Sequence, residues 1–388
     1  MGKFIPLSVP NLEGNEKEYL EDCIDTTFVS SVGQYVTKFE AMVAEATGSG
    51  YAVATSSGTT GLHAALTAVG AKHGDLVIIP TFTFIASANS IAHCGAKPWL
   101  MDIDPSSWCL NASLIRTEIE KNCEKKDGVL IHKQTGNRVA ALMPVYTLGN
   151  IPDMKAMRQI ADEYEIPLVV DAACAVGATY EGQNFGALAD LSVLSFNGNK
   201  TITCGGGGAV VGNDEKLLSH VRHLTTTARV WPDYDFDEVG FNYRMTNIQA
   251  AVGVAQMERL SNFITTKRFV RKYYEYQLSQ LSSKGISFFP TTNGSSCWFS
   301  GIVLPEGTEL NTVKDICSEL KKADIEARSF WKPVHLQKPY KDCPRSSVEV
   351  SEGLWQRIIT LPCSTNIDEE DLGFVSRKVI EAVERVCG

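Results

Sequence analysis

One lysine of this sequence stands where a lysine is unusual. The segment "DLSVLSFNGNKTITCGGGGAVV" begins with an apolar run, continues through a short polar stretch that ends at Lys200, and then contains four consecutive glycines. Burying a lysine is costly unless its ammonium group is paired or is used chemically. An amine held at such a place can attack a carbonyl carbon and carry protons. The ordinary alternative is an exposed lysine in a turn.

A second segment has the composition of an anion-binding turn. The residues "SSGTTG" (56–61) follow a predicted strand and open a predicted helix; Gly58 allows close approach of the backbone, and Thr59 and Thr60 offer hydroxyl groups. The N-terminus of a helix presents free N–H groups to a phosphate. The segment is neither a Walker loop nor a dinucleotide-binding glycine motif. Serine and threonine at a helix start are also ordinary N-caps, so both interpretations stay open for the segment alone.

Two further side chains leave predicted strands. Asp171 ends "IPLVVDAA", 29 residues before Lys200, and Phe84 lies in "PTFTF". Taken singly, the acid could be a cap or turn residue and the aromatic ring part of the core. Taken with the lysine and the phosphate cradle, they are the parts that pyridoxal 5'-phosphate (PLP) needs. The lysine forms a Schiff base, the acid keeps the pyridine nitrogen protonated, and the cradle holds the phosphate.

The elements that must position these residues form an alternating pattern. Between residues 50 and 212, short apolar runs alternate with helical patterns, which is typical of a largely parallel sheet covered on both faces. Side chains that follow such strands gather at one edge, next to helix N-termini. We expect a large α/β domain over residues 41–260 and a smaller α+β domain over residues 261–388. The N-terminal residues 1–40 are expected to pack on the small domain or on a partner subunit, and one long helical pattern starts at Asn247.

Composition excludes several classes of protein. The 388 residues carry a formal net charge of −9 and no basic patch, so we expect no nucleic-acid partner. No stretch approaches the length of a membrane span and the chain starts without a signal-peptide pattern, so we expect a cytoplasmic protein that does not bind membranes. The eleven cysteines form no C-x-x-C pair, which favours reduced thiols. His220 and His223 lack a third ligand in the sequence around them, so we expect no metal site.

Seven segments resemble, in order, the signatures of one enzyme family. They are "VSSVGQYVTKFE", "YAVATSSGTTGLHAAL", "PTFTFIASANSI", "VDAACAVGATYEGQNFG", "SFNGNKTITCGGGGAVV", "FNYRMTNIQAAVGVAQMERL" and "SFWKPVHLQKPY". Over nearly its whole length the chain resembles the PLP-dependent nucleotide-sugar aminotransferases of the DegT/DnrJ/EryC1/StrS family. The resemblance implies fold-type I, which is the α/β fold of aspartate aminotransferase-like enzymes, with a mostly parallel sheet in the large domain.

The resemblance also implies a role for each matched residue. Lys200 matches the Schiff-base lysine, and Asp171 matches the partner of the pyridine nitrogen. The remaining cofactor contacts it implies are Thr59 and Thr60 after Gly58 at the phosphate, Ser195 at the phosphate, Phe84 over the ring, and Asn242 reaching the phosphate from the neighbouring subunit. The last contact implies a homodimer with shared active sites. Arg229 and His335, the latter in "WKPVHLQKPY", are expected to contact the sugar substrate.

The sequence departs from the family pattern at two places. Many relatives carry glutamine or histidine three residues after the aspartate, near the phenolic oxygen of the cofactor, and this chain has Cys174. A thiol is a weak donor, so that cofactor contact is lost, weakened or supplied elsewhere. The glycine run "CGGGG" also lacks the acidic residue that many members have. Dehydratases of the same family carry histidine in place of the lysine, and Lys200 argues against that branch.

Several segments most resemble enzymes that aminate C4 of a nucleotide-linked 4-keto-6-deoxy sugar. We expect L-glutamate as the amino donor, 2-oxoglutarate as its product, and a UDP-linked 2-acetamido sugar of the bacillosamine or legionaminic acid pathways as acceptor. The alternative acceptors are other nucleotide keto-sugars, linked to GDP or dTDP and aminated at C3 or C4. Three other classes of protein stay open: a desulfurase or lyase of the same fold, a regulatory or scaffolding protein without turnover, and a nicotinamide enzyme, which would need the missing glycine fingerprint.

Overall fold

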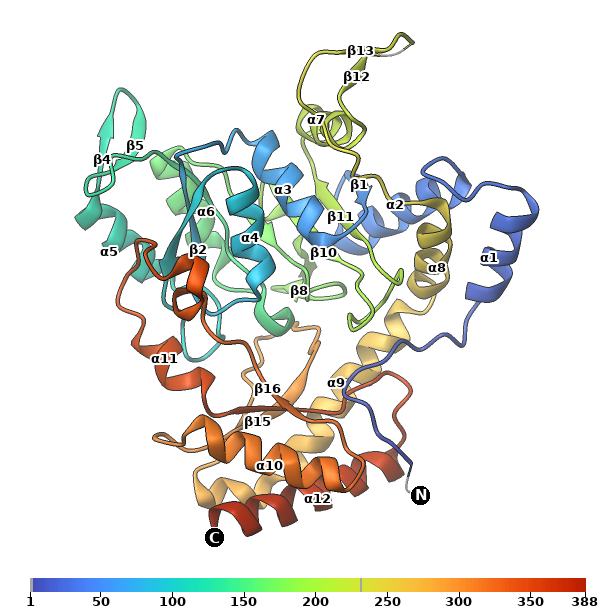
Figure 1. The fold of residues 1–388 in the computed structure, drawn as a ribbon, viewed down its shortest axis with the longest axis vertical. Helices are drawn as coiled ribbons and strands as arrows, with labels where there is room; N and C mark the ends of the chain where they lie inside the picture. Colours follow the sequence, from blue (N-terminus) through green and yellow to red (C-terminus); the bar gives the residue numbers. More distant parts are fainter. Residues whose placement is uncertain (1–2, 231) are drawn as a thin grey trace.

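The structure, a computed structural model, describes residues 3–230 and 232–388. Figure 1 shows a larger part, which holds the blue and green segments, and a smaller part made mainly of the orange and red segments near the C-terminus. Helix α9 (Leu260–Gln277) leads the chain from the larger part to the smaller one. The boundary expected near residue 260 therefore falls at the start of this helix, and the division into domains stays an interpretation.

One seven-stranded sheet organises the larger part. Two ladders, with the orders β3-β2-β6 and β7-β10-β11-β1, are joined by parallel bridges from Leu142 to Leu168 and from Val145 to Asp171. The strands are β1 (Tyr51–Thr55), β2 (Leu76–Pro80), β3 (Lys97–Met101), β6 (Val139–Leu142), β7 (Val169–Asp171), β10 (Leu191–Ser195) and β11 (Gly208–Gly212). All neighbouring pairs are parallel except those made by β11. The prediction of a mostly parallel sheet is confirmed.

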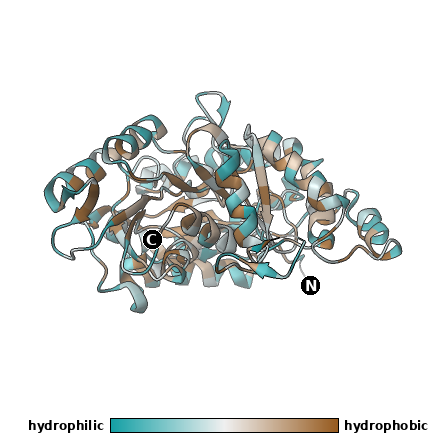
Figure 2. Cartoon of the chain, turned by 90° about the horizontal axis from the view of Figure 1, so that it is seen from above, coloured by the Kyte–Doolittle hydropathy of each residue, from teal (hydrophilic) through white to brown (hydrophobic). Residues whose placement is uncertain are grey.

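Helices cover both faces of this sheet, because successive side chains of each strand point to opposite sides. In β2, Ile78 belongs to one hydrophobic core, and Val77 and Ile79 belong to the other. The first core is closed by α2 (Gln34–Thr47), α5 (Ala112–Asn122), α6 (Met154–Tyr164) and α8 (Asn247–Met257), and the second by α3 (Gly58–Ala68), α4 (Ile85–His93) and α7 (Glu215–Thr225). Figure 2 shows several of the central strands in brown, and teal residues on many of the outer helices.

The smaller part has a sheet of its own. Its strands, in the order β14-β15-β17-β16, are all antiparallel and comprise Ser287–Phe288, Ser300–Val303, Ile358–Leu361 and Arg328–Ser329, respectively. Helices α9, α10 (Leu310–Lys322) and α12 (Glu369–Cys387) pack on it, and α11 (Glu349–Trp355) precedes β17. In α10 the buried residues Val313, Ile316 and Leu320 recur at the spacing of an amphipathic helix face.

The N-terminal residues contact both parts of the chain. Ile5 forms a parallel bridge with Ile325 of the smaller part, and its N–H donates to the carbonyl of Asp324 at 2.8 Å. Helix α1 (Glu16–Asp25) lies beside α8, where the Tyr19 hydroxyl donates to Glu258 Oε1 at 2.8 Å. Glu258 stands at a break between α8 and α9, so the single long helix expected from Asn247 is two helices.

The remaining elements are three small hairpins and several 3₁₀ turns. The hairpins are β4 (Cys123–Lys126) with β5 (Val129–His132), β8 (Thr179–Tyr180) with β9 (Gln183–Asn184), and β12 (Arg229–Val230) with β13 (Asp235–Phe236). The β12–β13 hairpin stands off the body of the protein beyond α7 (Figure 1). Within the described ranges, we find no helix long and apolar enough to cross a membrane.

Candidate active site

Several of the predicted cofactor residues lie at the carboxyl edge of the main sheet. Strands β7 and β10 are parallel neighbours and end at Asp171 and Ser195, and β1 and β2 end at Thr55 and Pro80. Lys200 follows β10 in a loop, and its N–H donates to the carbonyl of Asn197. Ligands of open α/β sheets bind at this edge, so the topology alone accounts for the convergence of these segments.

Asp171 is a buried carboxylate with a defined orientation. Its side chain is held at the end of β7, and the residue is 5% exposed. The N–H of Ala173 donates to Oδ1 at 3.0 Å, and the hydroxyl of Ser87 donates to Oδ2 at 2.7 Å. Burial raises the pKa of this carboxyl, and the two donors and Lys200 oppose that rise. This environment suits a carboxylate that a buried cation will neutralise.

The amine of Lys200 lies between a thiol and an aromatic ring. Its Nζ donates to Cys174 Sγ at 3.3 Å and lies 3.8 Å from the centre of the Trp298 ring. Burial raises the pKa of the Cys174 thiol, and Lys200 opposes that rise. The indole N–H of Trp298 donates to the carbonyl of Asn199 at 2.7 Å, which fixes the ring beside the amine. The structure thus brings Lys200 and Cys174 together and adds Trp298, which the sequence analysis missed.

The predicted phosphate cradle is the first turn of α3, where Ser57 is the N-cap. The N–H of Thr60 donates to Ser57 Oγ at 3.1 Å, and the N–H of Ser57 donates to Thr60 Oγ1 at 3.0 Å. Gly58 faces the end of β10, since a Cβ placed there would lie 2.9 Å from Ser195 Cβ. Gly58 and Ser195 therefore border one spot at a helix N-terminus, and Thr59 follows Gly58 in the same turn. The N-cap interpretation also holds, because the Thr60 hydroxyl is engaged in the cap.

Gly208 of the glycine run packs against this cradle. A Cβ at Gly208 would lie 2.5 Å from the Ser57 carbonyl oxygen and 2.6 Å from the Gly58 nitrogen. Such distances force the turn to move. The close neighbour of Gly208 is therefore the backbone of the cradle turn itself.

Gly208→Ala is expected to weaken the affinity of the apoprotein for PLP about tenfold or more, because the displaced turn no longer presents its N–H groups correctly. The matched control is Gly206→Ala in the same run. The nearest atom to a Cβ there, Gln249 Nε2, is 3.6 Å away. Absorbance titration of both apoproteins with PLP gives the two dissociation constants. Equal constants for the two variants would contradict this account of the cradle.

Phe84 is placed at the start of α4 and is not part of the core. It is the N-cap of that helix, and 55% of its surface is exposed. Its ring centre lies 6.1 Å from that of Trp331. Since α4 also carries Ser87, which contacts Asp171, the exposed ring borders the same region. Its role over the cofactor ring stays a prediction.

The structure places the two predicted substrate contacts differently. His335 is 4% exposed; its Nδ1 lies 2.6 Å from Thr81 Oγ1 and its Nε2 lies 3.1 Å from Glu352 Oε1, so both ring nitrogens have protein partners. Burial lowers the pKa of this imidazole. Arg229 lies in the β12–β13 hairpin, stacked at 3.9 Å on the ring of Tyr234. Neither residue is brought to Lys200 by a contact within the described part of one chain.

Asn242, the residue expected to serve the neighbouring subunit, is exposed and forms an isolated bridge with Thr226. The next residue, Tyr243, accepts a hydrogen bond at its carbonyl from the N–H of Ser56 at 2.8 Å. The segment that carries Asn242 therefore borders the cradle turn from its outer side.

The fold also supplies carboxylates beside the two histidines of α7. His220 Nε2 lies 3.0 Å from Glu238 Oε1, and His223 Nε2 lies 2.6 Å from Asp237 Oδ1. These pairs join α7 to the segment after β13. The sequence argument that no carboxylate accompanies the histidines is wrong, because residues 14 to 18 positions downstream fold back onto the helix. The four groups pair with each other at the surface.

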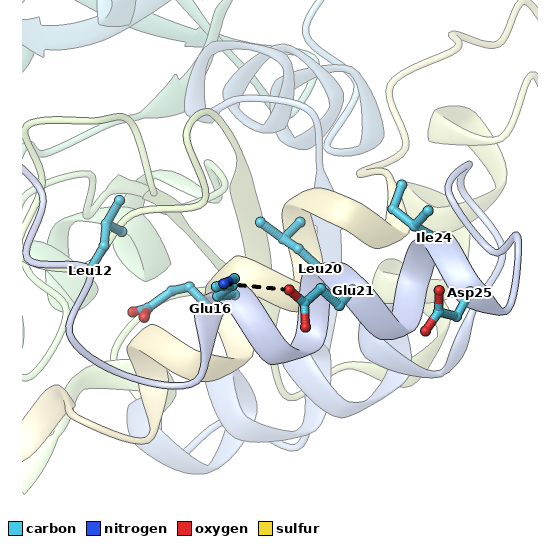
Figure 3. A pocket seen from close by; sticks show the side chains of 7 residues that line it. Leu12, Glu16, Leu20, Glu21, Ile24 and Asp25 are labelled. Atoms are coloured by element: carbon cyan, nitrogen blue, oxygen red, sulfur yellow. Dashed lines mark ion pairs between the residues drawn. The ribbon is translucent and has the colours of Figure 1, made fainter.

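A hollow of about 420 Å³ lies along α1, away from the predicted site residues. Figure 3 shows its walls, formed by Leu12, Leu20 and Ile24 together with carboxylates of the same helix. Lys17, which also lines the hollow, is paired with Glu21. Apolar and acidic walls do not suit a phosphate, so this hollow is not the cofactor site.

The residues at the sheet edge fit PLP. A buried carboxylate, an accessible aromatic ring, a helix N-terminus and a lysine amine meet there. When bound, PLP supplies an aldehyde and a ring that withdraws electrons from the substrate carbon. Around it, Asp171 would hold the pyridine N–H, the first turn of α3 with Ser195 would bind the phosphate, and Lys200 Nζ would bind and move protons.

Comparisons with known proteins identify the family of this chain. The model of the DegT/DnrJ/EryC1/StrS aminotransferase family matches residues 10–383. A GDP-perosamine synthase from Caulobacter vibrioides is 36% identical over 98% of this chain and 98% of its own, and one from Vibrio cholerae is 35% identical over 92% and 93%.

Solved structures share the fold. A putative sugar aminotransferase from Streptococcus pneumoniae, in its PMP form, aligns with a TM-score of 0.88 at 23% identity over 99% of both chains. PseC of Helicobacter pylori, an aminotransferase of pseudoaminic acid biosynthesis, aligns with a TM-score of 0.88 at 20% identity over 99% of this chain and 100% of its own. With the family model matched over almost the entire length, the chain belongs to the DegT/DnrJ/EryC1/StrS aminotransferase family and is a PLP-dependent nucleotide-sugar aminotransferase of fold-type I.

Proposed function

We propose that this enzyme transfers the amino group of L-glutamate to C4 of a GDP-linked 4-keto-6-deoxy sugar. The observation that carries the proposal is the near full-length similarity to GDP-perosamine synthases, at 36%, 35% and 34% identity. The sequence analysis favours a UDP-linked acetamido sugar instead. The names of these relatives support the GDP-linked alternative, and the UDP-linked assignment to bacillosamine or legionaminic acid pathways is not retained.

In this reaction Lys200 moves protons at two substrates. Its Nζ takes a proton from Cα of L-glutamate, which leaves as 2-oxoglutarate once its nitrogen has been transferred. In the second half the same amine delivers a proton to C4 of the sugar, where the ketone oxygen has left as water and the nitrogen from L-glutamate has taken its place. The Trp298 ring lies 3.8 Å from Nζ, and the Cys174 sulfur accepts one of its N–H bonds. Both contacts hold the amine in place between the two proton transfers.

We also propose that the working enzyme is a homodimer, with Asn242 of each chain serving the phosphate of its partner. The exposure of Asn242 in the single chain supports this role, since a residue used across a subunit interface is solvent-exposed in the isolated chain. The projecting β12–β13 hairpin would then carry Arg229 toward the sugar of the partner site. His335 is better suited to support the Thr81 end of β2 than to bind sugar directly.

Substrate comparison tests the proposed acceptor. With L-glutamate as donor, kcat/KM for the GDP-linked 4-keto-6-deoxy sugar is expected to exceed that for the UDP- and dTDP-linked sugars by at least about tenfold. The reason is that the nucleotide part of each substrate makes different contacts with the enzyme. The measurement is the release of 2-oxoglutarate with each purified keto-sugar. A preference for the UDP-linked sugar would overturn the GDP assignment. Loss of all transfer, with PLP bound, would favour the scaffolding alternative.

A further inference from the structure

The carboxylate of Asp171 depends on one side-chain donor. Among the described residues, that donor is Ser87, whose Oγ lies 2.7 Å from Asp171 Oδ2 in a buried environment. The other donor is the backbone N–H of Ala173, at 3.0 Å from Oδ1. A backbone N–H is available whatever the side chains are. The orientation of the carboxylate about its last bond is therefore decided by Ser87.

The direction of the hydrogen bond is fixed by a second hydroxyl. Thr83 Oγ1 lies 2.9 Å from Ser87 Oγ, and Thr83 is also buried. An ionised carboxylate can only accept, so Ser87 must give its single proton to Asp171. Thr83 must then donate to the oxygen of Ser87. The two hydroxyls form a relay that ends on the carboxylate.

Helix α4 gives the relay a rigid base. Ser87 lies in the first turn of α4, where its N–H donates to the carbonyl of Phe84 at 3.2 Å. The N-terminus of a helix favours a negative charge close to it. The start of α4 therefore carries two residues of the predicted site. Phe84 is expected to meet the ring of the cofactor, and Ser87 contacts Asp171, the carboxylate expected to meet the pyridine nitrogen.

We propose that Ser87, supported by Thr83, is a positioning residue that orients the Asp171 carboxylate toward the pyridine nitrogen and keeps it ionised. The inference rests on the assignment of Asp171 to that nitrogen. Ser87 does not itself touch the reacting atoms. Its effect is on how tightly the cofactor is held and on the lowest pH at which the cofactor works.

The test uses the full-length enzyme with PLP and L-glutamate alone, so that no sugar is involved. Ser87→Ala is expected to weaken PLP affinity about tenfold or more, because a hydrogen bond to a charged group is lost in a buried place. Loss of a donor to the ionised form raises the pKa of Asp171 further, so the acid limb of the half-reaction rate shifts to higher pH. Lys200 and Cys174, the other titratable groups facing this carboxylate, are the same in every variant.

Two variants separate positioning from a general structural role. Ser87→Thr keeps a hydroxyl and is expected to restore both the affinity and the acid limb. Ser90→Ala removes a neighbouring buried hydroxyl, which donates to the Ser87 carbonyl at 2.8 Å, and is expected to move neither. Ser87→Ala with wild-type affinity and acid limb would overturn the inference, as would equal shifts in Ser87→Ala and Ser90→Ala.

The half-reaction also separates this inference from the proposed function. A wrong acceptor sugar leaves the L-glutamate half-reaction of every variant unchanged. A wrong assignment of Asp171 appears as wild-type PLP affinity in Asp171→Asn, whatever Ser87 does. The Ser87 effect is therefore measured on its own.

Discussion

Replacement of Lys200 by alanine is expected to abolish multiple turnovers while the protein stays folded. In the proposed reaction the amine moves protons at Cα of L-glutamate and at C4 of the sugar, and a positioned acid–base group alone contributes about 10²- to 10⁴-fold to a rate. The variant would also lack the amine predicted to attach PLP covalently, so kcat is expected to fall at least about 10³-fold. The fold should survive, because Lys200 lies in a loop and is only half-buried. Release of 2-oxoglutarate over several enzyme equivalents measures the loss.

The control for this variant is Lys155→Ala. Lys155 is an exposed lysine that pairs with Glu181 at 2.6 Å on the surface, so its loss is expected to leave kcat and PLP affinity unchanged. Circular dichroism of both variants establishes that the fold is intact. Sustained turnover by Lys200→Ala would mean that another amine carries the chemistry, and the assignment of the site would fail.

The sequence allows the positions of Lys200 and Asp171 to be predicted because both follow buried strands. In a parallel sheet the carboxyl ends of neighbouring strands meet at one edge, so β7 and β10 deliver Asp171 and Ser195 to one place. The apolar runs that mark these strands are easy to read. Lys200 is the fifth residue after Ser195, so it stays close to the strand end that carries Asp171.

The direction of β11 follows from the absence of a crossover helix rather than from side chains. No helix intervenes between Ser195 and Gly208, and a parallel connection needs a crossover of about a dozen or more residues, usually a helix. The loop instead folds back, and β11 runs antiparallel to β10. An apolar run such as "GGAVVG" looks alike in both directions, so its composition could not decide this point.

Trp298 and Ser87 could not be found from the sequence, for different reasons. Trp298 reaches Lys200 from the smaller part of the chain, 98 residues further along, and only the packing of the two parts brings them together. Ser87 is near Phe84 in sequence, but a serine in the first turn of a helix is so common that its type carries no signal. Its role depends on which carboxylate it meets, and that is a property of the sheet.

Asp171→Asn is expected to lower kcat about 100- to 1,000-fold and to weaken PLP binding, because the amide keeps the shape of the side chain but has no charge for the pyridinium. Ser87 can still donate to the amide oxygen, but the amide has one acceptor oxygen where the carboxylate has two, so the N–H of Ala173 loses its partner. The rate is measured as the half-reaction with L-glutamate.

The control for this variant is Asp102→Asn. Asp102 is a buried aspartate that accepts bonds from Ser351, Val350 and Ile103, and its replacement is expected to cost stability but not PLP affinity.

The same substitution at Asp171 is expected to stabilise the apoprotein. The direction of this change in stability follows from the pKa of the buried carboxyl. Burial raises the pKa of Asp171 above its ordinary value of 3.8 in the folded state. Such a group favours folding below the ordinary pKa, and this contribution is lost as pH rises through the higher folded pKa. Above that window the wild-type apoprotein carries a buried charge that the Asp171→Asn variant lacks, so the melting temperature of the variant should exceed that of wild type at neutral pH and the gain should vanish in acid. A variant as fast as wild type with L-glutamate would show that the pyridine nitrogen has another partner. A variant less stable at neutral pH would show that the hydrogen bonds to the carboxylate outweigh the cost of its buried charge. If the variant is instead more stable, the buried charge of Asp171 lowers the stability of the apoprotein, and PLP binding would restore it. The stability of the folded enzyme would in this way depend on its cofactor.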